Sequence, residues 1–219
     1  MRVIPEVKTI LLTGGIGSGK SSAAAVLSSL GIAVYNADTR VKALYENVQG
    51  LVDELEKILG CSLRDDLGSF DKKKLATCIF GANAAENLAL VEGVVFPYLL
   101  DDFKDYSRKM AIEASSRGQN GPIYVAMESA TALEKTAFHD FGDIRLVVDA
   151  PIELRLERAC MRDGATREQI LDRMNEQPLM NSISKGDVPQ GIDAVIMNDS
   201  TLEVLQQRVK MVLEKLTII

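Results

Sequence analysis

A glycine-rich segment near the N-terminus constrains the fold of this chain more than any other feature. Residues 14–21, GGIGSGKS, fit the pattern G-x-x-x-x-G-K-[ST]. The apolar run from Val7 to Leu12 precedes them and is typical of a buried parallel strand, while Ser21 to Leu30 follow with helical spacing. In this setting the backbone N–H groups of the loop point at phosphate oxygens, and the helix dipole adds positive potential. We therefore predict a phosphate-binding loop rather than a glycine-rich turn that only joins a strand to a helix.

The motif predicts different roles for its lysine and its serine. Lys20 would reach the β- and γ-phosphates of ATP, and the Ser21 hydroxyl would hold Mg²⁺. No N-K-x-D guanine motif follows, and the D-x-x-G segment Asp65 to Gly68 lies in a helical region, which argues against a GTPase. A small-molecule kinase is favoured instead. The residues expected to contact the nucleotide are Gly15, Ile16, Gly17, Ser18, Gly19, Lys20, Ser21 and Ser22.

The periodicity of the remaining chain predicts an α/β fold. Strands expected at residues 32–35, 123–127, 144–148 and 194–197 would join the first strand in a parallel sheet, and a helix at residues 202–216 would close the chain. Residues 39–117 have helical spacing, interrupted at Pro97. We predict an α/β fold of the P-loop kinase-like class, with a five-stranded parallel sheet wrapped by helices, a helical insertion and an arginine-bearing lid. Residues 1–38 and 119–219 would form the nucleotide-binding core, with the lid at about 153–178, and residues 39–118 would form a helical acceptor domain.

Composition and charge exclude several other classes of protein. The 31 acidic and 25 basic residues give a net charge of −6, which argues against nucleic acid as the main partner. No apolar run approaches the ~20 residues of a membrane span and no secretion signal is evident, so we expect a cytoplasmic protein that makes no membrane contact. Cys61, Cys78 and Cys160 fit neither a zinc motif nor a disulfide framework, and we interpret them as small apolar residues. No protein partner is inferred.

Carboxylates after the second and third predicted strands are candidates for catalysis and metal support. Asp38 would lie at the carboxyl edge of the sheet, where it could accept the proton of an attacking hydroxyl. It could equally cap a helix that begins near Thr39, and both roles are compatible. Glu128 either supports Mg²⁺ through water or caps the next turn. His139, the only histidine, is expected to be exposed.

Arginines cluster late in the chain. The spacing of Arg155, Arg158 and Arg162 places them on one face of a helix, and Arg167 and Arg173 follow on the next helical segment. One interpretation is a lid whose arginines close over a triphosphate and neutralise its charge. The other is a pair of solvated helices with salt bridges to neighbouring acids. The sequence leaves both open.

Three segments together resemble the dephospho-CoA kinases, which use ATP to phosphorylate the ribose 3′-hydroxyl of dephospho-CoA. LLTGGIGSGKSSAAAVLSSLGIAVYNAD is similar to the opening of that family, and RACMRDGATREQILDRMNEQ is similar to its lid. VIMNDS is similar to its strand-then-asparagine segment near the nucleotide base, and ESATALE resembles its segment after the third strand. The match extends over nearly the whole chain.

The resemblance implies roles for particular residues. Asp38 would be the general base, and Arg158 and Arg162 would contact the ATP phosphates. Arg40 and the helical insertion would face dephospho-CoA, with Asp38 beside the same substrate. Asn198 would lie near the nucleotide base.

The chain also departs from the family pattern. Asn36 stands where the family has the first acid of D-A-D, and Phe96 stands where the family has a histidine before Pro97. The proline usual after the third strand is missing from Glu128 to Glu134. Two alternatives therefore stay open beside a dephospho-CoA kinase: a P-loop kinase of a nucleoside or sugar hydroxyl, and a regulatory protein that binds nucleotide with weakened catalysis.

Overall fold

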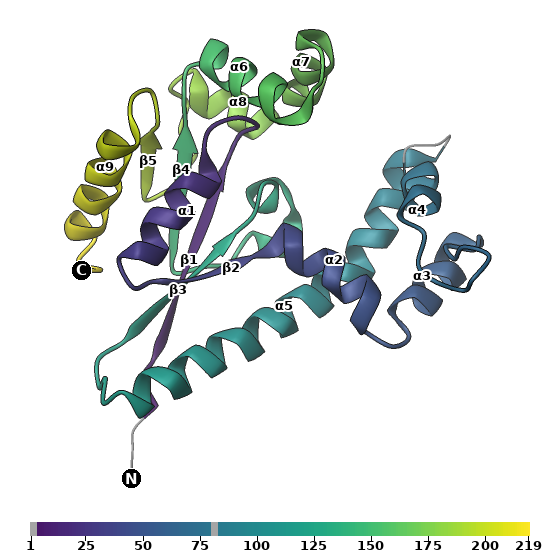
Figure 1. Ribbon diagram of the computed structural model, residues 1–219, viewed down its shortest axis with the longest axis horizontal. Coiled ribbons are helices and arrows are strands. Elements are labelled where there is room, and N and C mark those ends of the chain that lie inside the picture. The colour runs from purple at the N-terminus through teal and green to yellow at the C-terminus, as the bar shows by residue number, and fades with distance from the viewer. Residues whose placement is uncertain (1–3, 80–82) are drawn as a thin grey trace. The chain divides into compact units, whose positions relative to one another are not determined.

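The computed structural model describes residues 4–79 and 83–219 and contains one five-stranded sheet (Figure 1). Neighbouring strands pair in parallel in the order β2-β3-β1-β4-β5. This confirms the predicted parallel sheet. The strands are β1 (Val7–Gly14), β2 (Ala33–Asn36), β3 (Ile123–Glu128), β4 (Ile144–Asp149) and β5 (Ala194–Met197).

Helices occupy most of the rest of the described chain. α1 directly follows the phosphate loop, and two short 3₁₀ turns, Ala132–Glu134 and Thr136–Phe138, separate β3 from β4. His139 directly follows the second of these turns and is exposed, as expected. The helices are α1 (Lys20–Ser29), α2 (Ala37–Asn47), α3 (Leu51–Leu59), α4 (Lys72–Ile79), α5 (Ala84–Ser116), α6 (Ile152–Asp163), α7 (Arg167–Asn175), α8 (Pro178–Ser184) and α9 (Leu202–Lys215).

The chain divides into two compact units. The first contains residues 1–36 and 107–219, and the second contains residues 37–106. The first unit contains the sheet, and both faces of the sheet are buried. Ile10 and Leu12 point to the face covered by α1 and α9, while Val147 packs with residues of α8 on the other. Because successive strand residues alternate between faces, this two-sided burial explains the continuous apolar run of β1.

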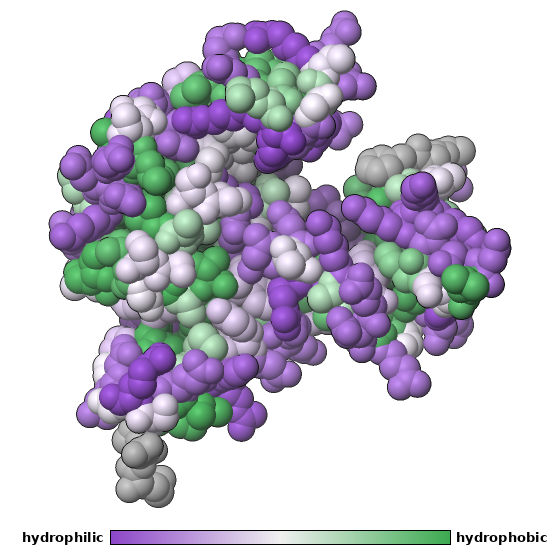
Figure 2. All heavy atoms as spheres, viewed as in Figure 1, coloured by the Kyte–Doolittle hydropathy of each residue, from purple (hydrophilic) through white to green (hydrophobic). Residues whose placement is uncertain are grey.

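The surface of the molecule in the view of Figure 2 is mostly hydrophilic, with hydrophobic residues gathered over α9 and β5. Met197 and Met211 are among the exposed hydrophobic residues of these elements. Within the described part of the chain, no helix is both long enough and apolar enough to cross a membrane.

The second unit is helical. Its buried side chains come mainly from α3 and α5, and Tyr45 of α2 stacks on Phe70 with ring centroids 4.5 Å apart. Burial raises the pKa of Tyr45 to about 12. Among the described residues of this unit, the buried hydrophobic ones are Ala37, Leu44, Leu51, Val52, Leu55, Leu63, Leu75, Val91, Val95, Leu99 and Phe103.

Two local expectations were wrong. Pro97 does not interrupt its helix, because α5 continues through it from Ala84 to Ser116. A proline inside a helix removes one backbone donor and crowds the carbonyl four residues earlier, here that of Gly93, yet the helix is continuous. The helix expected near Thr39 begins two residues earlier, because α2 starts at Ala37 and includes Asp38 in its first turn.

Candidate nucleotide-binding site

The phosphate loop joins the end of β1 to the start of α1. Gly17 and Gly19 adopt positive φ angles of 75° and 88°, a region that side chains disfavour. A Cβ atom on Gly17 would also lie 2.1 Å from the carbonyl oxygen of Arg155, and one on Gly19 would lie 2.0 Å from Nδ2 of Asn198. Both positions therefore require glycine for conformation and for space.

The loop ends where a helix N-terminus favours an anion. Gly19 is the N-cap of α1, so no side chain caps the first N–H groups of this helix. Such groups, together with the helix dipole, form a site for phosphate oxygens. The predicted nucleotide contacts from Gly15 to Ser22 lie along this loop and the first turn of α1.

Glu128 forms the polar centre at the foot of the loop. Its Oε1 accepts hydrogen bonds from Nζ of Lys20 at 2.8 Å and from Oγ of Ser21 at 2.7 Å. Its Oε2 accepts a hydrogen bond from Nδ2 of Asn36 at 2.9 Å. Glu128 is only 3% exposed. Burial opposes ionisation of this carboxyl, but the hydrogen bonds and charge of Lys20, with the bonds from Ser21 and Asn36, hold its pKa below the usual value.

The strand register explains how this cluster forms. Glu128 is the last residue of β3 and lies opposite both Leu12 of β1 and Asn36 of β2. The carboxyl ends of parallel strands meet at one edge of the sheet, which is the usual ligand edge of this architecture. The sequence alone is compatible with either metal support or a turn cap for Glu128, and it indicates only the loss of an acid at Asn36. A signal that could have found the cluster is that two predicted parallel strands each end at a polar residue, Asn36 and Glu128.

Ser21 and Glu128 offer suitable ligands for a divalent cation. Their oxygen atoms lie 2.7 Å apart, and Mg²⁺ prefers hard oxygen donors. Glu128 also carries negative charge beside the predicted phosphate site. These residues fit Mg²⁺ and give Lys20 a counter-ion.

A buried arginine supports the loop from behind. Arg155 is fully buried, and its Nε donates to the carbonyl of Ile16 at 2.9 Å. Its Nη1 donates to Oγ of Ser184 at 3.0 Å and to Oδ1 of Asp149 at 3.4 Å. Among the described residues, Nη2 has no hydrogen-bond partner. Burial lowers the pKa of Arg155, and Asp149 partly offsets this by favouring the charged form.

Arg155 departs from both interpretations of the arginine cluster, which remain open for the other arginines. It is neither a solvated member of a surface helix pair nor a lid residue over a triphosphate. It lies inside the first unit, where a Cβ atom on Gly15 would come within 2.1 Å of its Nη2. Helical spacing placed Arg155 and Arg158 on one face but could not show that this face packs against the loop.

Two more side chains fix the loop backbone. Oε1 of Gln177 accepts a hydrogen bond from the N–H of Ile16 at 3.0 Å. Nδ2 of Asn198 donates to the carbonyl of Ser18 at 2.8 Å. Both side chains are nearly fully buried. The loop is thus held by segments that lie more than one hundred residues later in the sequence, at separations of 161 and 180 residues.

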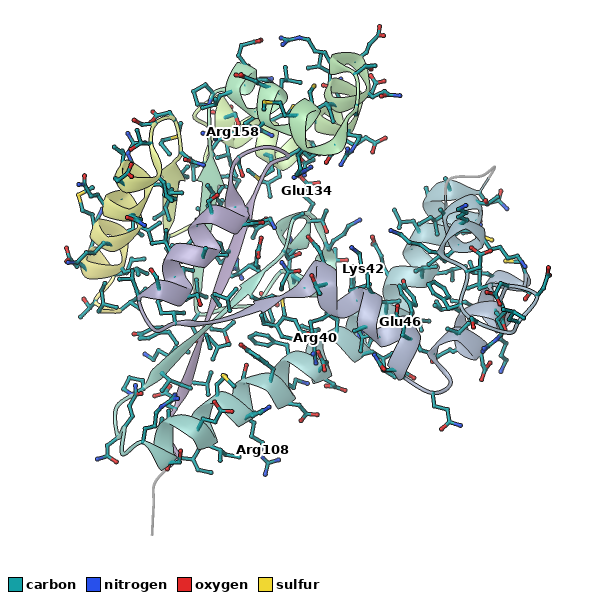
Figure 3. The ribbon with its side chains drawn as sticks, in the orientation of Figure 1. Arg40, Lys42, Glu46, Arg108, Glu134 and Arg158 are labelled. Carbon is teal, nitrogen blue, oxygen red and sulfur yellow. The ribbon has the colours of Figure 1, made fainter. Side chains whose placement is uncertain are left out.

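Arg158 and Arg162 lie in different surroundings. Arg158 is half-buried beside the loop (Figure 3), where its Nη1 donates to the carbonyl of Asn198 at 3.0 Å. The Arg162 side chain is 61% exposed and pairs with Asp163. The same carboxylate accepts a hydrogen bond from Arg173 at 2.7 Å. These two arginines hold the pKa of Asp163 well below its usual range, so the surface ion pairs expected as one alternative do occur.

Asp38 and Arg40 belong to the helical unit. Both are exposed on α2. Asp38 lies two residues after Asn36 in the sequence, and Asn36 donates a hydrogen bond to Glu128. Nε of Arg40, which is labelled in Figure 3, donates to Oδ2 of Asp102 at 2.7 Å, and Nη2 donates to the other oxygen of the same carboxylate. The roles of Asp38 and Arg40 toward substrate stay predictions.

Comparison with known proteins agrees with this architecture. A family model described as dephospho-CoA kinase matches residues 8–203. A dephospho-CoA kinase of Porphyromonas gingivalis is 33% identical over 190 residues, which cover 87% of this chain and 85% of the relative. One of Aquifex aeolicus is 29% identical over 212 residues, 96% of this chain and 98% of the relative.

Solved structures have the same fold. A Thermus thermophilus protein superposes with a TM-score of 0.68 at 29% identity, covering 98% of this chain and 99% of that one. A dephospho-CoA kinase from Campylobacter jejuni superposes with a TM-score of 0.59 at 22% identity, covering 96% and 97% of the two chains. The predicted α/β fold class and the family resemblance are both confirmed. The chain belongs to the dephospho-CoA kinase family.

Proposed function

We propose that this protein transfers the γ-phosphoryl group of ATP to the ribose 3′-hydroxyl of dephospho-CoA, giving CoA and ADP. Membership of the family supports this reaction. The observation that carries it is the polar centre at Glu128, which gathers Lys20 and Ser21 at the foot of a loop shaped for phosphates. A regulatory protein or a kinase of another hydroxyl is less favoured, because relatives over most of the chain are dephospho-CoA kinases.

The loop and the first turn of α1 would bind the triphosphate of ATP. Backbone N–H groups from Gly15 to Ser22 would donate to the phosphate oxygens, and Lys20 would share its charge between Glu128 and the phosphates. Ser21 and Glu128 would hold Mg²⁺, which supplies positive charge that neutralises the phosphates. Asn198 would contact the nucleotide while it holds the carbonyl of Ser18.

Phosphoryl transfer needs positioning and charge neutralisation more than a strong base. Asp38 would accept the proton of the 3′-hydroxyl while the hydroxyl oxygen bonds to the γ-phosphorus and ADP leaves. Arg158 and Arg162 would neutralise charge that spreads over the phosphoryl oxygens, and Arg162 would have to leave Asp163 to do so.

The helical unit would bind the acceptor. We assign residues 39–118, most of which lie in the helical unit, to the acceptor domain, with Asp38 and Arg40 contacting dephospho-CoA. Arg40 already holds a carboxylate in a two-point contact, the geometry that guanidinium groups use for phosphates. We also propose a cytoplasmic location, as the composition suggested.

The direct test measures ADP release with Mg²⁺ and ATP in three reactions, containing dephospho-CoA, adenosine or no acceptor. ADP release that requires dephospho-CoA, with a product of the mass of CoA, is expected.

Asp38→Asn should lower kcat by roughly ten- to ten-thousand-fold with little change in ATP affinity. Lys20→Ala should weaken both ATP binding and rate. Tight ATP binding without turnover of any acceptor would instead support the regulatory alternative.

A further inference from the structure

Two of the three cysteines lie together in the helical unit. Cys61 follows the C-cap of α3, and Cys78 lies in the last turn of α4. Their Sγ atoms are 2.9 Å apart, although 17 residues separate them in sequence. A disulfide bond is about 2.03–2.05 Å long, so a small movement would join the two sulfurs. Cys160, on α6, belongs to the other unit.

The backbone around Cys61 is fixed by contacts that do not involve sulfur. Gly60 ends α3 in the left-handed conformation, with φ of 66°. Glu56 then accepts hydrogen bonds from the N–H of Leu63 at 2.7 Å and from Oγ of Ser62 at 3.1 Å. These bonds also hold the pKa of Glu56 below its usual value. The turn that carries Cys61 is therefore set by the fold.

The segment that carries Cys78 is anchored independently. Nδ2 of Asn87, on α5, donates to the carbonyl of Cys78 at 2.9 Å. Leu75, three residues earlier on α4, is buried and places this helix on the core of the unit. Two separately anchored segments thus bring the thiols together, and neither cysteine is fully buried.

The helical unit would gain from a covalent link. It contains only residues 37–106, and units of about 70 residues have small cores that are commonly strengthened by disulfides or metals. The polar contacts of the segment from α3 to α4 include exposed ion pairs, such as that of Arg64 with Asp53. Exposed ion pairs stabilise little.

We propose that Cys61 and Cys78 form a reversible disulfide that ties the end of α3 to α4. The oxidant is a small-molecule disulfide such as oxidised glutathione. One protein thiolate attacks it and releases one glutathione, and the second protein thiolate then displaces the other glutathione. The two protein thiols thus lose two protons and two electrons, and one disulfide is reduced to two thiols. A dithiol reverses the reaction. The proposal does not depend on the proposed kinase activity.

The test treats the full-length protein with oxidised glutathione, counts free thiols, and maps peptides without reduction. Loss of two of the three thiols is expected, with a linked peptide pair containing Cys61 and Cys78 and a mass decrease of about 2 Da. Dithiothreitol should restore both thiols. The oxidised protein should also melt about 5–10 °C above the reduced protein.

Matched variants separate the pair from the remaining thiol. Cys160→Ser should form the same link, whereas Cys61→Ser and Cys78→Ser should not form it and should show no rise in melting temperature. Circular dichroism checks that the variants are folded. If a variant does not fold, the peptide map of the unaltered protein still shows whether Cys61 and Cys78 are linked. Single glutathione adducts without a link, dimers joined through Cys160, or unchanged thiols would each overturn the proposal.

Discussion

The two units of this protein use polar contacts differently. Around the phosphate loop the contacts are buried and join distant segments, as Asn198 does with Ser18 across 180 residues. In the helical unit they are mostly exposed and short-range, as in the pair of Arg64 with Asp53, 11 residues apart. Buried polar groups are costly to leave unpaired, while exposed ion pairs are worth little. The loop should therefore be sensitive to single substitutions, and the helical unit tolerant of them.

The largest effect should come from Arg155→Met. Removing the guanidinium leaves the Asp149 carboxylate and the carbonyl of Ile16 without a buried partner. Breaking a buried pair in this way costs about 3–5 kcal/mol in the free energy of unfolding, measured by urea titration. Arg155→Lys should lower the free energy of unfolding by less, because lysine keeps the positive charge although it lacks the planar donors of arginine.

Arg167→Met is the matched control for that experiment. Arg167 pairs with Glu153 on the surface, where the two side chains are 57% and 71% exposed. Its loss should change the free energy of unfolding by less than about 1 kcal/mol. Equal losses for the Arg155 and Arg167 variants would remove the contrast between buried and exposed contacts.

The next largest effect should follow Glu128→Gln. The substitution keeps the shape of the side chain but removes the charge that faces Lys20 and adds a donor beside Ser21. We expect kcat to fall by at least about 10- to 100-fold, the cost of losing a group that only orients a metal ligand. Stability should fall by about 1–3 kcal/mol. Steady-state kinetics over a range of Mg²⁺ concentrations measures the first effect.

The pH dependence of stability gives a second readout for Glu128. Its pKa is lowered in the folded protein, so the ionised group stabilises the fold above its unfolded pKa of about 4.5. That contribution is lost as the pH falls through the lower, folded pKa. Urea titrations from neutral to acidic pH should therefore lose less stability for Glu128→Gln than for the unaltered protein. Identical profiles would contradict the assigned role of the carboxylate.

A smaller effect is expected for Asn36→Asp. The amide of Asn36 now donates to Glu128, and a carboxylate there would place like charges side by side. The folded protein should lose about 1–2 kcal/mol of stability, and millimolar Mg²⁺ should restore part of it by binding between the carboxylates. Asn47→Asp is the control, because the Asn47 amide donates to the carbonyl of Ala43 at an exposed site. If both variants lost stability and Mg²⁺ did not restore it in either, the prediction would be wrong.

The sequence predicted the sheet and the loop because both depend on local patterns. The apolar run of β1 and the glycines after it can be recognised without knowing any partner. The burial of Arg155 could not be predicted, because helical spacing shows which residues share a face but not what covers it. The same holds for Cys61 and Cys78, which the fold brings together from separate helices. Asn36 was identified as a departure, but its bond to Glu128 depends on strand register.

The smallest stability effect should come from Arg40→Gln, in the tolerant unit. Arg40 pairs with Asp102, and the two side chains are 45% and 22% exposed. Losing this pair should cost only about 0.2–1 kcal/mol, and Arg64→Gln is a matched control with a similar cost. If Arg40 binds dephospho-CoA, its variant alone should raise the KM for that substrate, by about tenfold for the loss of one charge-assisted contact. Equal KM values in the two variants would make Arg40 a surface ion pair and would move the acceptor site elsewhere on the helical unit.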